Sequence, residues 1–130
     1  LALLTLCPLL LASPKRLTRE QARQLVLKVL ELEGYPTMAP KLELHDNEIM
    51  EKEYLPDFYF FDSYYDTETR LAATGHWAVS KKTADVWEWM LCRKLGPRAL
   101  RSHQESIRKQ IRLSTEQYHR LSKKAPCRKD

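Results

Sequence analysis

The sequence is poor in glycine, with three glycines in 130 residues, at positions 34, 75 and 96. A phosphate-binding loop needs glycines in close succession, because its backbone must approach the phosphates without side chains in the way. The chain also lacks a Gly-x-Ser-x-Gly elbow, a His-Glu-x-x-His helix and paired Cys-x-x-Cys units. These absences exclude the common nucleotide-binding, serine-hydrolase and zinc-site motifs, so we expect no cofactor.

Histidines and acidic residues also offer little for catalysis. The four histidines, at positions 45, 76, 103 and 119, do not have the spacing of metal ligands. Acids gather between positions 43 and 57, and a small hydrolase acting through two of these carboxylates is one alternative function. Solvated loop acids explain the same cluster more simply, and we predict that the protein is not an enzyme.

Cysteine is equally scarce, and its placement indicates an exported protein. Residues 1–11 read LALLTLCPLLL, nine of them apolar, and the small residues Ala12-Ser13 follow. This pattern is typical of a signal peptide, so we expect residues 1–13 to be a leader remnant and residues 14–130 to form one domain. Loss of the leader would leave Cys92 and Cys127, which we expect to form a disulfide in a secreted or periplasmic protein.

Charge is distributed unevenly along the chain, whose formal net charge is +5. Residues 1–39 carry five Lys/Arg and three acids, residues 40–92 carry five and eleven, and residues 93–130 carry twelve and three. The three segments therefore have net charges of +2, −6 and +9, which add up to +5. An acidic middle and a basic C-terminal third favour an encounter with a charged partner.

Three helices are predicted from capping signals and apolar periodicity. Thr18 and Gln21 form the pattern of a capping box before a helix over residues 19–33, which Gly34 ends. Gly96-Pro97 precedes a second helix over residues 98–112, and Ser114 with Gln117 starts a third, which reaches about residue 123.

Three strands are predicted between the helices, over residues 58–65, 71–79 and 85–91, with one short strand near residues 42–44. Trp77 and Val79 share one face, and we expect Trp87, Trp89 and Leu91 to share another and to pack against the first helix. The predicted fold class is α+β, with an N-terminal helix, a three-stranded antiparallel meander and two C-terminal helices packed on one sheet face.

Aromatic and basic side chains provide the candidate binding surface. The tyrosines of the first long strand tolerate a wet surface, and three arginines of the second helix fall on one stripe beside its apolar face. The candidate residues are Tyr59, Tyr64, Tyr65, Arg101, Arg108 and Arg112. The sequence contains no nucleic-acid recognition motif, so we expect no nucleic acid as a partner.

The segment from Gly75 to Trp87, GHWAVSKKTADVW, resembles a hairpin of PepSY-type domains and of small immunity proteins of nuclear-transport-factor-like fold. The helix opening LTREQARQLV, from Leu17 to Val26, is similar to the start of PepSY domains. Ser80 and Ala84 stand where those families usually carry Asp and Gly. The resemblance implies a non-catalytic module that binds another protein, and it implies no catalytic residue.

Together these observations predict an exported binding module, an inhibitor or immunity-type protein whose partner is another protein. One alternative is an envelope-associated protein that binds anionic lipid or cell-wall polymer through its basic C-terminal helices. The other is the small hydrolase considered above.

Overall fold

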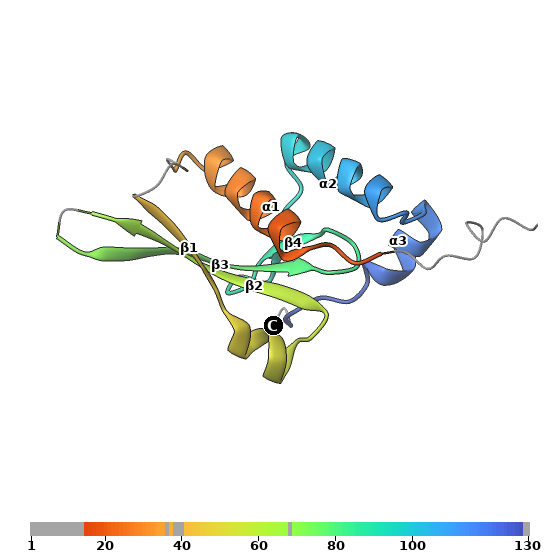
Figure 1. Ribbon diagram of the computed structural model, residues 1–130, viewed down its shortest axis with the longest axis horizontal. Coiled ribbons are helices and arrows are strands. Elements are labelled where there is room, and N and C mark those ends of the chain that lie inside the picture. The colour runs from red at the N-terminus through yellow and green to blue at the C-terminus, as the bar shows by residue number, and fades with distance from the viewer. Residues whose placement is uncertain (1–14, 36, 38–40, 68, 129–130) are drawn as a thin grey trace, which may run out of the picture.

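The computed structural model describes residues 15–35, 37, 41–67 and 69–128 (Figure 1). In chain order the elements are helix α1 (Arg19–Leu32), strand β1 (Leu42–Asp46), the short π-helix η2 (Met50–Tyr54), strands β2 (Phe58–Asp66), β3 (Leu71–Ser80), β4 (Val86–Glu88) and β5 (Arg93–Lys94), and helices α2 (Arg98–Gln110) and α3 (Thr115–Leu121). The α+β class is confirmed. The expected leader lies outside the described residues, and within them no helix is long and apolar enough to cross a membrane.

Helix α1 forms where the capping signals predict it. The Thr18 hydroxyl accepts the Gln21 N–H, and the Gln21 side chain accepts the Thr18 N–H, which completes the capping box. Its buried residues are Ala22, Leu25, Val26, Val29 and Leu30. Leu17, just before the helix, is 2% exposed and belongs to the same core.

The sheet has five strands in the order β1-β2-β3-β4-β5, and each pair of neighbours is antiparallel. The short strand expected near residues 42–44 is β1, and β5 was not predicted, so the meander has five strands rather than the expected three. The edge strand β1 is held to α1 by Arg23, which donates one hydrogen bond to the Leu44 carbonyl oxygen (3.0 Å) and another to the Asp46 carboxylate (3.1 Å).

The strand predicted over residues 85–91 forms as β4 but is shorter than expected, because β4 ends at Glu88. The Glu88 carboxylate accepts the Leu91 N–H at 2.7 Å, and Cys92 adopts a left-handed φ of 50°, so residues 89–92 turn. Leu91 consequently does not share a sheet face with Trp87 and is 66% exposed.

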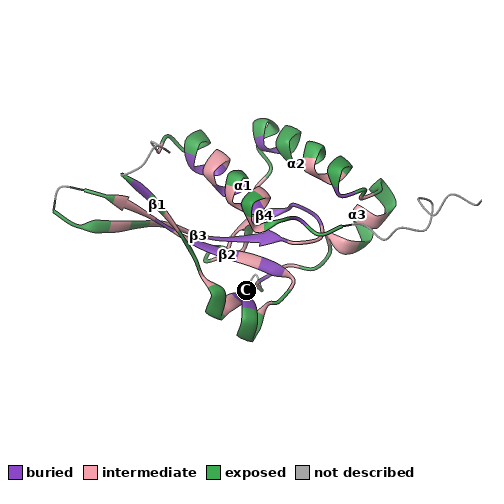
Figure 2. Ribbon diagram, viewed as in Figure 1, coloured by how far each residue is buried: buried purple, intermediate pink, exposed green. Residues whose placement is uncertain are grey.

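One face of the sheet packs against the helices (Figure 2). Phe61, Trp77, Val79 and Val86 from the strands join α1 in the main core, together with Leu100 of α2. Helices α1 and α2 lie side by side above the sheet, and α3 lies at its end (Figure 1). The expected layer of two C-terminal helices is thus only partly correct, since α3 has no buried residue.

The opposite face carries a second, smaller core. Phe58, Phe60 and Ala78 are buried there, and partly buried residues of η2 and of the turn after β4 pack on them. Trp87 and Trp89 belong to this second core rather than to the core under α1, which corrects the prediction for both tryptophans. The edge of Trp89 meets the Phe60 ring, with ring centroids 6.2 Å apart.

Candidate functional site

Tyr59, the first predicted surface tyrosine, faces the helices and is half-buried. Its hydroxyl donates to the Leu17 carbonyl oxygen at 2.8 Å, and the Arg19 guanidinium lies 4.9 Å from its ring centroid. Burial raises the pKa of Tyr59. This tyrosine therefore joins the N-terminal segment to the sheet.

Tyr64 and Tyr65 lie on opposite faces of β2. Tyr65 pairs with Leu42 of β1 and packs against the main core, where its ring centroid is 6.3 Å from that of Tyr35. Tyr64 is on the other face, where its ring centroid is 5.1 Å from that of His45. Of the three tyrosines, Tyr64 is the one on the sheet face away from the helices.

The three predicted arginines of the second helix region separate into two environments. Arg101 and Arg112 are exposed, and Arg112 follows α2 with a left-handed φ of 60°. The Arg108 side chain is only 17% exposed and points inward to Asp85, at 3.0 Å from its carboxylate. Its charge is thus committed within the molecule.

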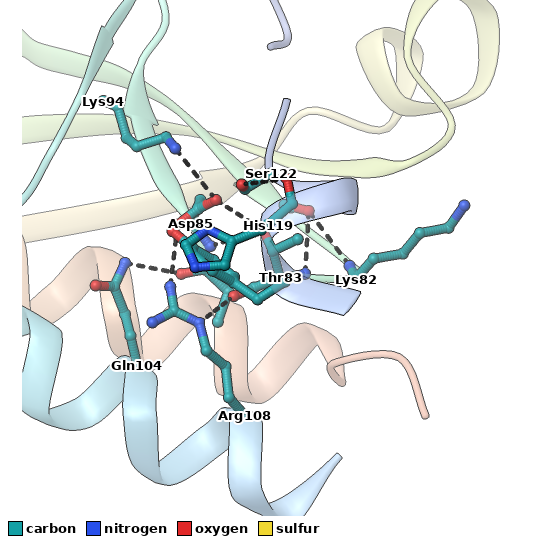
Figure 3. Close-up of polar contacts among 11 residues, drawn as sticks. Lys82, Thr83, Asp85, Lys94, Gln104, Arg108, His119 and Ser122 are labelled. Atoms are coloured by element: carbon teal, nitrogen blue, oxygen red, sulfur yellow. Dashed lines mark hydrogen bonds and ion pairs between the residues drawn. The ribbon is translucent and has the colours of Figure 1, made fainter. Parts of the chain in front are cut away.

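Asp85 is the centre of a polar network that sequence reasoning missed (Figure 3). Its carboxylate is 5% exposed and accepts hydrogen bonds from the Thr83 hydroxyl (3.0 Å), the Tyr118 hydroxyl (2.9 Å) and Arg108. Lys94 of β5 is 3.6 Å away. Burial, with Asp85 as the next cause, raises the pKa of Tyr118. The network joins the β3–β4 turn to α2 and α3, as a buried carboxylate with several donors can do.

The acids of the middle segment are only partly brought together. Asp46, Glu48 and Asp62 line an open hollow of about 580 Å³, with His45 and Tyr64 beside them. Asp46 is already paired with Arg23, and Asp62 accepts hydrogen bonds from Asn47 (3.0 Å) and lies 2.7 Å from His76. Glu51 and Asp57 do not line this hollow and pair instead with Arg19 and Lys124. Carboxylates that are already paired in this way are poorly placed for the proton transfer of a hydrolase.

The predicted disulfide between Cys92 and Cys127 is present in the structure. It holds the C-terminal tail against the turn after β4, where the Trp89 indole N–H donates to the Pro126 carbonyl oxygen at 3.3 Å. Among the described residues, no group of three or more His, Cys, Asp or Glu is placed to hold a metal ion.

Comparison with known proteins gives one structural relationship. No family model matches the chain, and no curated protein matches it. A chain in the solved structure of a type VI secretion system effector–immunity complex from Pseudomonas protegens is similar in fold, with a TM-score of 0.64 and 26% sequence identity. The similarity covers 83% of this chain and 88% of that chain. It therefore spans the α+β domain, and the resemblance to PepSY-type domains stays a prediction.

Proposed function

We propose that this chain is an immunity-type protein, a non-catalytic module that binds a toxic effector protein and holds it inactive. The observation that carries the proposal is the similarity to a chain of an effector–immunity complex over 83% of the present chain. The hairpin from Gly75 to Trp87, which resembles one found in small immunity proteins, supports the same function. Fold alone does not define function, so a direct binding experiment is needed.

We also propose that the protein acts after export, in the periplasm or outside the cell. The disulfide between Cys92 and Cys127 supports this location, because disulfides persist in oxidising compartments. We propose further that residues 1–13 direct the export, as the leader pattern in the sequence predicts.

The proposed contact surface includes the sheet face around Tyr64 and the open acidic hollow beside it. Ile49 at the rim of this hollow is 67% exposed, and Tyr54 of the neighbouring η2 is 65% exposed. Exposed aromatic and aliphatic side chains next to charged ones are the composition from which binding hot spots are built.

The test is co-production of this chain with the candidate toxin proteins that the genes neighbouring its own encode. We expect one of these candidates and this chain to form a stable complex in size-exclusion chromatography, and cells that make both to grow where cells with that candidate alone do not. An unrelated effector serves as the control. The proposal is wrong if none of these candidates binds this chain or loses its toxicity in its presence.

Envelope binding is a second candidate, favoured by the exposure of Arg101 and Arg112. Vesicles containing anionic lipid would bind the protein in a salt-sensitive way, because each exposed cation near the surface adds attraction. Loss of vesicle binding in an Arg101→Glu/Arg112→Glu variant would support this candidate, and equal binding by the variant would remove it.

A further inference from the structure

A basic hollow lies where the N-terminal segment, the β3–β4 turn and α3 meet. Two adjoining cavities of about 200 and 120 Å³ open there and share Lys82, Arg120 and Leu121. We call this feature the cationic depression. Its basic lining residues are Lys15, Arg16, Lys82, Arg120 and Lys124.

The cations of the depression exceed its anions. Asp57 is the only carboxylate among the described residues that line the two cavities. It lies 2.6 Å from Lys124, 3.7 Å from Lys82 and 3.9 Å from Arg16, and the hydrogen bond from Lys124 is the main cause that lowers its pKa. Five basic side chains against one carboxylate leave a surplus of four positive charges, which an anionic ligand would neutralise.

The backbone under these side chains is fixed by main-chain hydrogen bonds. The Leu17 N–H donates to the Lys81 carbonyl oxygen (2.8 Å), and the Lys81 N–H donates to the Asp57 carbonyl oxygen (2.9 Å). The Lys15 N–H donates to the carbonyl oxygen of Ile111 (2.9 Å). Four segments that are distant in sequence are therefore held together at the depression before any ligand arrives, and this lowers the ordering cost of binding.

The buried Asp85 network holds in place two of the elements that form the depression. It secures the β3–β4 turn through Thr83 and α3 through Tyr118, and these two elements carry Lys82 and Arg120. Lys82 itself extends outward, away from the network (Figure 3). Arg108 is paired with Asp85 inside the molecule, whereas Lys82 and Arg120 line the depression, where a ligand could contact them.

We propose that the cationic depression binds an acidic segment of the partner protein, with two or more Asp or Glu carboxylates spaced across the two cavities. This inference rests on the proposed function, in which the partner is a protein, and it names the chemistry of the contact. Lys82 and Arg120 line both cavities, so a carboxylate in either cavity would lie beside these two cations. Leu121 also lines both cavities and offers an apolar contact for the methylene groups of the acidic side chain.

The shape of the depression favours separated carboxylates over a single phosphate. The basic side chains lie around two cavities rather than converging on one point, and those of Arg16, Lys82 and Lys124 are 59%, 39% and 58% exposed. A tight phosphate site is built from converging backbone N–H groups. Long basic side chains spread over a broad surface can instead pair with several carboxylates that are separated from one another.

The first test measures binding of the effector by biolayer interferometry, with a matched pair of variants. Arg120→Gln/Lys124→Gln removes two cations from the depression, and Arg98→Gln/Lys109→Gln removes two exposed cations from α2. We expect the first variant to weaken binding about tenfold and to reduce its salt dependence, and the second to change binding by less than about threefold. Equal effects of the two variants, or no effect of either, would overturn the inference while leaving the immunity function intact.

The second test does not need the effector, so it separates this inference from the proposed function. Hexaglutamate peptide is titrated into the isotope-labelled full-length protein, and backbone amide shifts are followed by NMR. We expect saturable shifts centred on Lys82, Arg120 and Lys124. Shifts spread evenly over α2 would overturn the inference. So would a stronger response to inorganic phosphate, or to anionic vesicles, at equal ionic strength.

Discussion

At the scale of single residues, Trp77 shows how a large side chain depends on small neighbours. Trp77 is 1% exposed, and its indole N–H donates to the Ser63 hydroxyl at 2.8 Å. The ring lies over Gly75, where an added Cβ would approach the ring atom Cε2 to 2.6 Å. The sequence predicts that Trp77 and Val79 share a face, but not that the ring folds back over Gly75, because that depends on the cross-strand partner Ser63.

We predict that Gly75→Ala lowers the free energy of unfolding by about 1–3 kcal/mol, because the new methyl group must displace the Trp77 ring. Urea unfolding followed by tryptophan fluorescence measures the change. Gly96→Ala is the matched control, since a Cβ there meets nothing within 4 Å. A Gly75→Ala variant as stable as the control would contradict the packing described.

The Asp85 network also belongs to the residue scale, and it explains why the arginine stripe was only partly predictable. Helical spacing places Arg101, Arg108 and Arg112 near one another on the surface of a helix. Spacing alone does not show which of these arginines pairs with a buried carboxylate from a distant part of the chain, as Arg108 does with Asp85. Asp85 is the first residue of the strand predicted over residues 85–91, and nothing in the local sequence marks it as buried.

At the scale of elements, local signals predicted the helices well and the short strands poorly. Thr18 and Ser114 start α1 and α3 as expected, because a capping box acts within four residues. The C-terminal end of β4 is set instead by the Glu88 side chain, which accepts the Leu91 N–H. The position of η2 is fixed by Arg19, which is distant in sequence. Glu51 of η2 is 5% exposed, accepts the Phe60 N–H at 2.9 Å and is hydrogen-bonded to Arg19 at 2.8 Å.

The pairing of Glu51 predicts a pH dependence of stability. Burial alone would raise the pKa of Glu51, but the bonds from Arg19 and Phe60 outweigh it, and the pKa falls below its ordinary value of 4.5. A carboxyl whose folded pKa is lowered contributes its stabilisation above the unfolded pKa, and this is lost as the pH falls through the folded pKa. Stability should therefore decline below about pH 4.5.

We expect Glu51→Gln to cost about 2 kcal/mol of unfolding free energy at pH 7, because it breaks a charged hydrogen bond at a buried position. The difference from wild type should shrink when unfolding is measured near pH 3. Glu53→Gln, on the exposed side of the same element, is the control and should change little. A Glu51→Gln cost that is the same at both pH values would show that the carboxylate charge contributes nothing.

At the scale of the whole molecule, each face of the sheet carries a core, and the two cores differ in origin. The helices cover one face through a continuous apolar core, whose periodicity the sequence displays. The second core is covered by η2 and by the turn after β4, in which the C-terminal tail contacts Trp89. The disulfide could be predicted from an even cysteine pair, whereas the second core could not, because its residues come from short irregular segments.

We predict that reduction of Cys92–Cys127 lowers the melting temperature by several degrees or more. The bond closes a loop with a sequence separation of 35, for which the chain-entropy model gives about 3–4 kcal/mol. Calorimetry with and without reductant measures the effect. A Cys92→Ser/Cys127→Ser variant should melt like the reduced protein and should not respond to reductant, and identical melting of the oxidised and reduced wild type would refute the prediction.

The contact of Arg23 with β1 has a consequence for the behaviour of the protein at high concentration. An open edge strand is a template on which another chain can add its own strand, and sheets that grow in this way aggregate. Arg23 occupies the Leu44 carbonyl oxygen at this edge and places a positive charge beside it. Because this carbonyl oxygen is already bonded and a charge stands beside it, addition of a strand from a second copy of the chain is disfavoured at the β1 edge.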